Sequence, residues 1–293
     1  MVIPLLNATA MTVTFYKRGA SYLGAFVLAL AATSASAGSI FVTGHDPIWH
    51  SNFGGNAAGA INLATTGIEY ARNGSALPFL YIESKTTPIP SGNARTASFL
   101  TSALGYAAGT YSVMDAADLG ALTDFRATLG SYSAIVIASD HGGMLGATEL
   151  AFLNSRNSDI LSYLNAGGGL YAEAESNATG QIGTTQRFGF LPFLVSSTDF
   201  QAGEVSNTVT AFGAGLGLVN SDVNRNFSHN YFSSSGGMSA VDLFNGDTAV
   251  PLTLAFRGQV TPGGVVPEPE TYAIMGLGLL LTAALRRRRF VRR

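Results

Sequence analysis

Histidine and carboxylate side chains follow several short apolar runs in this 293-residue sequence. If those runs are parallel strands, their carboxyl ends meet along one edge of a sheet, which is where open α/β sheets bind ligands. Carboxylates and imidazoles hold ions and polar ligands, so these side chains are candidates for a binding site. The candidate ligand-binding residues are His45, Asp46, His50, Asp140, His141 and Glu175. Further carboxylates at the same predicted edge are Glu83, Asp115 and Glu173.

A divalent metal ion is one ligand that these residues could hold. Imidazoles mixed with carboxylates suit zinc or manganese, and the sequence has no cysteine from which to build a structural zinc cage. His45, Asp46 and His141 are the candidate metal ligands. Their spacing is generic and differs from the helix-borne His-Glu-x-x-His pair. The alternative is structural, with Asp46 in a turn, Asp140 capping a helix and the histidines binding loop carbonyls.

Ser176 is a candidate catalytic nucleophile. It lies in the run Ala-Glu-Ser-Asn-Ala at 174–178, directly after a strand-like segment, and resembles the serine of a nucleophile elbow with alanine at both glycine positions. His229 follows it in the chain order of a serine–histidine pair, and Asp242 is the candidate acid partner. A cap or turn serine is the alternative interpretation.

Five strand-like runs alternate with longer helical patterns in the body of the chain. The runs are 39–44, 78–84, 111–115, 134–139 and 169–176. Some are apolar on both faces, which is typical of strands inside a sheet that is covered on both sides. We therefore predict an α/β fold with a doubly wound, mostly parallel sheet. After Thr185, glycine, serine and asparagine dominate, which predicts additional C-terminal β-strands at the sheet edge.

Two segments carry a resemblance to a known group of enzymes. They read YSAIVIASDHGG at 132–143 and ELAFLNSRNSDILSYLNAGGGLYAEAES at 149–176. With the order of elements, they resemble the class I glutamine amidotransferase-like group, which implies a three-layer, flavodoxin-like fold from Ile40 to Phe193. Members of that group use a cysteine nucleophile at the turn where this chain has Ser176. Because the sequence contains no cysteine, glutamine hydrolysis by that mechanism is excluded.

The C-terminal segment combines a Pro-Glu-Pro turn, an apolar run and an arginine cluster. The apolar run at 272–285 would be roughly 21 Å long as a helix, shorter than the roughly 30 Å hydrocarbon core of a membrane. The arginines that follow it can extend toward lipid phosphates and complete the span. The sequence therefore predicts a single C-terminal transmembrane helix at 272–285 and a cytoplasmic arginine-rich tail at 286–293.

The N-terminus has the features of an export signal. Two basic residues precede an apolar stretch, and Ala-Ser-Ala at 35–37 supplies the small residues that signal peptidase requires. We predict cleavage before Gly38. The predicted organisation is a signal peptide at 1–37, an α/β domain at 38–260 and a linker with the Pro-Glu-Pro motif at 261–271.

An export signal combined with this C-terminal segment resembles the PEP-CTERM proteins of Gram-negative bacteria. The resemblance covers residues 265–293 and has its three parts in the right order. It implies transient anchoring in the inner membrane, with signal peptidase and an exosortase as partners. The exosortase would recognise Pro267, Glu268 and Pro269, remove the tail, and deliver the protein to the cell surface or an exopolysaccharide matrix.

Charged residues are unevenly distributed along the chain. Eight of the 16 lysines and arginines lie in the two end segments, whereas all 18 acidic residues lie between them. The exported body is therefore acidic, which disfavours nucleic-acid binding. We expect a non-enzymatic envelope or matrix protein that binds a small ligand, an ion or a polysaccharide. The alternative is a hydrolase that uses a metal ion, or Ser176 with His229, at the carboxyl edge of the sheet.

Overall fold

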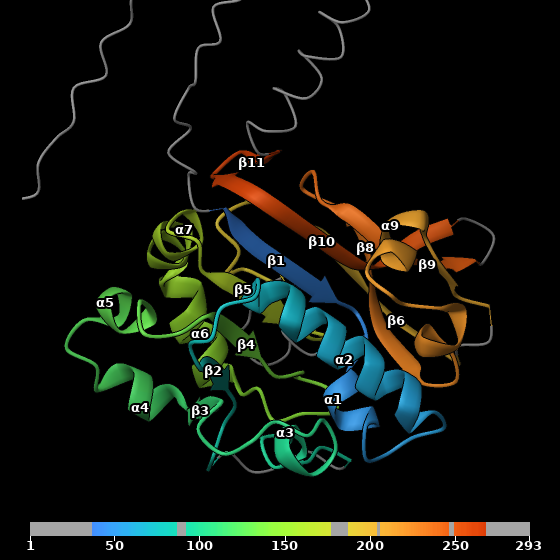
Figure 1. Ribbon diagram of the computed structural model, residues 1–293, viewed down its shortest axis with the longest axis horizontal. Coiled ribbons are helices and arrows are strands. Elements are labelled where there is room, and N and C mark those ends of the chain that lie inside the picture. The colour runs from blue at the N-terminus through green and yellow to red at the C-terminus, as the bar shows by residue number, and fades with distance from the viewer. Residues whose placement is uncertain (1–36, 87–91, 177–186, 204–205, 246–248, 268–293) are drawn as a thin grey trace, which may run out of the picture. The chain divides into compact units, whose positions relative to one another are not determined.

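Nine strands of the described chain form one mixed sheet (Figure 1). The structure is a computed structural model that describes residues 37–86, 92–176, 187–203, 206–245 and 249–267. These residues belong to one of the two compact units of the chain, Ser34–Arg293. The strand order is β3-β2-β4-β5-β1-β10-β9-β7, with β11 paired to β10. The prediction of a mixed α/β fold with a large sheet is confirmed.

Five parallel strands form one half of the sheet. They are β1 (Gly38–Thr43), β2 (Phe79–Ile82), β3 (Tyr111–Met114), β4 (Ala134–Ile137) and β5 (Gly169–Ala172). All except β3 are buried along their whole length, as is typical of parallel strands inside a sheet that is covered on both faces. Ile135 of β4 and Leu170 of β5 are register partners, so these two strands are neighbours.

Antiparallel strands extend the sheet beyond β1. β10 (Ala249–Thr261) pairs with β1, and β9 (Ser239–Asn245), β7 (Thr208–Val209) and β11 (Gly264–Pro267) complete this half. β6 (Ser196–Gly203) and β8 (Phe227–Ser234) form a separate antiparallel pair. The sequence predicts a linker from residue 261, whereas the structure continues as a β10–β11 hairpin to Pro267. The Thr-Pro-Gly-Gly run at 261–264 makes the turn of this hairpin.

Helices cover both faces of the parallel half. They are α1 (Pro47–His50), α2 (Ala57–Arg72), α3 (Phe99–Ser102), α4 (Ala116–Gly120), α5 (Phe125–Leu129), α6 (Ala147–Ser155) and α7 (Asn157–Asn165), followed by α9 (Ala211–Gly215) and the short η1 (Asn220–Val223) near the antiparallel half. The backbone of Gly67 in α2 lies against Phe41 and Tyr171, whereas Gly38 lies against Leu164 of α7. Residues 38 and 41 of β1 point to opposite faces, so α2 and α7 lie on opposite sides of the sheet.

The lateral order of the parallel strands, β3-β2-β4-β5-β1, differs from the flavodoxin order 2-1-3-4-5. Moving β1 from the start of the chain to its end would convert one order into the other. The flavodoxin-like prediction is therefore not confirmed. Sequence patterns report the elements in chain order and do not reveal which strands are neighbours. The observed order places the loop after β1 beside the loop after β5.

The described residues contain no helix that combines the length and the apolar composition needed to cross a membrane. The predicted transmembrane helix at 272–285, the arginine-rich tail at 286–293 and the signal peptide up to Ser36 lie outside the described residues.

Gly67→Ala tests the packing of α2 on the sheet. An added Cβ would lie 2.5 Å from Tyr171 Cε2 and 2.7 Å from Phe41 Cδ1, and both rings are fully buried. We expect the free energy of unfolding in urea to fall by about 1–3 kcal/mol, in spite of the higher helix propensity of alanine. Gly120→Ala in α4, where the added atom would meet nothing within 4 Å, is the control and should be neutral or slightly stabilising. Equal stability of Gly67→Ala and wild type would contradict this packing.

Candidate functional site

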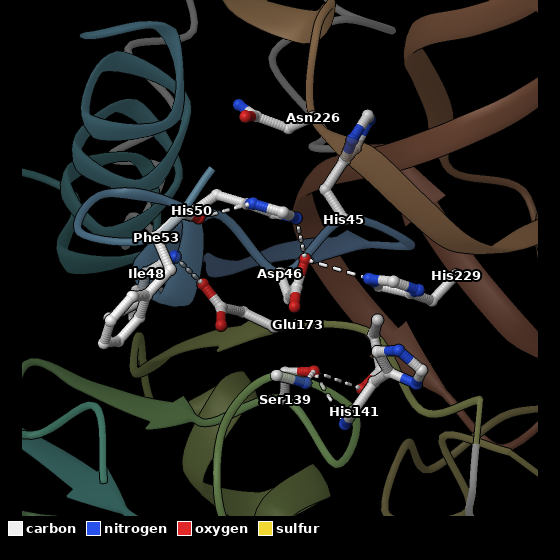
Figure 2. A network of polar contacts seen from close by, with 12 residues as sticks. His45, Asp46, Ile48, His50, Phe53, Ser139, His141, Glu173, Asn226 and His229 are labelled. Carbon is white, nitrogen blue, oxygen red and sulfur yellow. Dashed lines mark hydrogen bonds and ion pairs between the residues drawn. The ribbon is translucent and has the colours of Figure 1, made fainter. Parts of the chain in front are cut away.

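Loops from the carboxyl ends of β1, β4 and β5 meet because these strands are neighbours in the sheet. They bring Asp46 and His141 to one edge, where α1 adds His50 (Figure 2). β8, from the separate two-stranded sheet, adds His229. The cluster therefore combines loops that follow three neighbouring parallel strands with a side chain from β8, which comes much later in the chain.

Asp46 is the centre of this cluster. Its Oδ1 atom lies 3.0 Å from Nε2 of His50 and 3.1 Å from Nε2 of His229, and all three residues are at most 4 % exposed. Asp46 directly precedes α1 and His50 is its last residue, so the two side chains are one helical turn apart on the same face. Pro47 favours a helix start here because its missing N–H costs nothing at the first helical position.

The ring orientation of His50 determines the electrostatics of the cluster. Its Nδ1 atom lies 2.8 Å from the carbonyl oxygen of Phe53, which only accepts hydrogen bonds, so Nδ1 carries a proton. In a neutral imidazole the lone pair of Nε2 would then face Oδ1 of Asp46, and two acceptors at 3.0 Å repel each other. A second proton on His50, or a metal ion, removes this repulsion.

Asp46 carries a buried negative charge. Burial alone would raise the pKa of Asp46, but hydrogen bonds and charges from His229 and His50 outweigh this effect and hold the pKa well below its usual range. Among the described residues, Asp46, His50 and His229 form a group of potential metal ligands whose donor atoms all lie within 4.8 Å of one another. The cluster can therefore hold either a proton or a cation.

His141 lies beside this cluster. Its ring stacks on that of His229 with 3.7 Å between the ring centroids, and its Nδ1 is 3.1 Å from Oγ of Ser176. The sequence suggests Ser176 with His229 as a nucleophile pair, whereas the geometry pairs Ser176 with His141. Positive φ angles occur at other non-glycine positions of the described chain and not at Ser176, which thus lacks the strained backbone of a nucleophile elbow.

His45, a candidate metal ligand from the sequence, points away from Asp46 (Figure 2). Its Nε2 atom lies 2.9 Å from Oδ2 of Asp242, and both residues are buried. Consecutive residues at the end of a strand point in opposite directions, so His45 and Asp46 enter different sites. Asp242, which the sequence offers as the acid partner of His229, binds His45 instead.

Asp140 and Glu175 form a second buried acidic pair. Burial and the nearby charge of Asp140 raise the pKa of Glu175 well above its usual range, and Oε2 of Glu175 accepts a 2.6 Å hydrogen bond from the N–H of Phe188. Neither carboxyl belongs to the described group of potential metal ligands around Asp46. Two other predicted edge carboxylates have structural partners, since Asp115 caps α4 and Glu83 accepts two backbone N–H bonds.

Glu173 supports α1 from the end of β5 (Figure 2). Its Oε1 atom accepts hydrogen bonds of 2.9 Å from the N–H of Ile48 and 2.9 Å from the hydroxyl of Tyr171. Burial first, and the charge of Asp46 in addition, raise the pKa of Glu173 well above its usual range. The raised pKa favours the protonated carboxyl of Glu173, and its hydrogen bond to Ile48 joins β5 to α1.

The sequence predicts His50 as a ligand-binding residue but not as a metal ligand. The Asp-x-x-x-His spacing of Asp46 and His50 could have indicated that His50 is a metal ligand, because this spacing places both side chains on one face of a helix. No comparable signal exists for His229, which lies 183 residues after Asp46 and reaches it only through the packing of β8.

Residues 265–289 match the family model of the PEP-CTERM protein-sorting motif. The chain is exported and sorted by an exosortase to the cell surface. The matched segment begins within β11, so the sorting motif starts where the described domain ends. No curated protein and no solved structure matches the chain. The resemblance to the glutamine amidotransferase-like group therefore has no support from these comparisons.

Glu173→Gln tests whether Glu173 is neutral in the folded protein. Because its folded pKa lies above the ordinary value of 4.5, the unfolded chain loses this proton first as the pH rises, and stability falls above that pH. Glutamine keeps the Oε1 acceptor but does not titrate. We expect urea denaturation to give a fall in unfolding free energy from pH 5 to pH 8 that is smaller in the variant, by about 1 kcal/mol or more. The same pH dependence in both proteins would show that Glu173 is ionised when folded.

Proposed function

We propose that this exported domain binds a divalent metal ion, zinc or manganese, through Asp46, His50 and His229. The observation that carries the proposal is the convergence of three buried side chains, since Asp46, His50 and His229 each offer a ligand atom and these atoms lie within 4.8 Å of one another. Oδ1 of Asp46 is 3.0 Å from Nε2 of His50, a separation that two ligands of one ion also have. The carbonyl of Phe53 holds the His50 ring in this orientation, as outer-shell partners of metal-ligating histidines do.

The two contacts around Asp46 suit a first coordination shell. Two atoms that bind a tetrahedral zinc ion at about 2.0–2.1 Å lie roughly 3.3 Å apart, and at a right angle they lie roughly 2.9 Å apart. The contacts of 3.0 and 3.1 Å around Asp46 fall between these values. Two imidazoles and one carboxylate also form a donor set that zinc and manganese accept.

Burial limits what else can bind at this site. Three protein ligands leave a coordination position for an oxygen atom from outside the protein. The three proposed ligands are buried, whereas the neighbouring His141 is half-buried, so a small ligand such as water would approach past His141. The role that the geometry supports best is binding of the ion itself. A bulky polysaccharide would have to bind elsewhere on the domain.

Metal analysis of the purified protein tests this proposal. After equilibration with zinc or manganese and dialysis, we expect about one ion per chain by inductively coupled plasma mass spectrometry. Asp46→Asn should bind the ion at least about tenfold more weakly, because it replaces an ionised ligand by an amide. Asp242→Asn is the matched control, since it also removes a buried carboxylate that binds a histidine, but outside the cluster. It should retain the ion.

A wild-type protein that remains ion-free in excess zinc and manganese would contradict the metal site. The positive charge that compensates the Asp46 carboxylate would then come from protons on the histidines. Circular dichroism of both variants shows whether they are folded. If Asp46→Asn does not fold, isothermal titration of His229→Gln provides the same comparison.

We further propose that both ends of the chain are removed during sorting. β1 begins at Gly38, the predicted first residue after signal-peptide cleavage, and β11 ends at Pro267, the first residue of the Pro-Glu-Pro motif. The described fold thus lies between the two expected cleavage positions. Removal of the tail would free the domain for delivery to the cell surface or an exopolysaccharide matrix.

Intact-mass measurement of the protein in the cell-surface fraction tests this processing. We expect a chain that starts near Gly38 and ends close to Pro267, Glu268 and Pro269. Cells without the exosortase are the control and should retain the longer, membrane-associated form. A surface protein that still contains residues 286–293 would contradict removal of the tail.

A further inference from the structure

The loop after β4 and the end of β5 hold a serine and a histidine side chain in contact. Ile137 and Ala172 are register partners at the ends of these parallel strands, so the residues that follow them lie side by side. Oγ of Ser176 is 3.1 Å from Nδ1 of His141. We propose that Ser176 is a nucleophile and His141 its general base, and that this pair hydrolyses carboxylic esters. This activity goes beyond ion binding and does not require the ion.

Ser139 holds the two segments in this arrangement. Its hydroxyl accepts hydrogen bonds from the N–H groups of His141, at 3.0 Å, and Gly142, at 3.3 Å. The same hydroxyl donates to the carbonyl oxygen of Ala174 at 3.2 Å, which ties the loop after β4 to β5 two residues before the nucleophile. The contact between Ser176 and His141 is therefore built into the sheet edge rather than made by two free surface side chains.

Two carboxylates lie near the proposed general base, His141. The titratable groups that face it are His229 on β8, Asp46 before α1, His50 on α1, Asp199 on β6 and the hydroxyl of Ser176. Asp46 and Asp199 stabilise the imidazolium that forms when the ring accepts a proton.

The reaction has two balanced steps. Oγ of Ser176 forms a bond to the ester carbonyl carbon and its proton passes to Nδ1 of His141. The ester C–O bond breaks, and the alkoxide leaves as an alcohol with that proton. Water then attacks the acyl-serine, gives one proton to His141, and the carboxylic acid departs as Ser176 recovers its proton. His141 is half-buried and Ser176 is partly exposed, so an ester can reach both side chains.

A fluorophosphonate probe on the purified protein tests the proposal, because it labels only activated serines. We expect one probe per chain at Ser176 by peptide mass spectrometry, together with hydrolysis of p-nitrophenyl acetate. Ser176→Ala should lose both signals, and His141→Gln should slow labelling about 100-fold or more, since it removes the general base. Ser155→Ala is the matched control. Ser155 donates to a carbonyl of its own helix, and its replacement should leave labelling unchanged.

The outcome is independent of the ion. Labelling of Ser176 that depends on His141 supports the nucleophile pair whether or not EDTA is present, and it does so even if the protein binds no metal. Absence of labelling in the folded wild type overturns the pair, even if zinc binds. Labelling of Ser176 at the same rate in His141→Gln overturns the role of His141 as the base.

Discussion

A buried carboxylate has to be matched by positive charge, and Asp46 imposes this constraint on the whole edge of the sheet. An unmatched ion in a protein interior costs several kcal/mol even after relaxation. His50 meets part of the requirement from one helical turn away, and His229 meets the rest from β8. The charge thus links the two-stranded sheet to the parallel sheet, because only the docked β8 can bring the second imidazole to Asp46.

Two glycines allow the backbone to lie close to the side chains of Asp46 and His50. A Cβ atom at Gly142 would lie 2.0 Å from Oδ2 of Asp46, and one at Gly54 would lie 2.4 Å from Nδ1 of His50. Gly54 also has a φ of +145°, which other residues rarely adopt. These two glycines let the loops close over the cluster, and the loop that contains Gly142 carries His141 into contact with the ring of His229.

The same edge holds two neighbouring carboxyls whose pKa values shift in opposite directions. Asp46 receives hydrogen bonds from imidazoles, which lower its pKa and keep it ionised. Glu173 receives hydrogen bonds from the N–H of Ile48 and the hydroxyl of Tyr171, and burial raises its pKa. Environments that push the pKa values of two acids apart assign them different roles. Asp46 can bind a cation, whereas Glu173 positions α1 through its hydrogen bond to the N–H of Ile48.

Local information in the sequence determined the sorting motif at 265–289 and the five parallel strands, because both depend on residues that are close together along the chain. It also placed Asp46, His50 and His141 at one edge, since parallel strands share a carboxyl end. Only the tertiary structure decided which side chains meet. The lateral strand order, the opposite directions of His45 and Asp46, the docking of His229 from β8 and the pairing of Ser176 with His141 all depend on long-range packing. The order of the elements and the periodicity of apolar residues do not predict such contacts, because they form only when separate sheets pack around one buried charge.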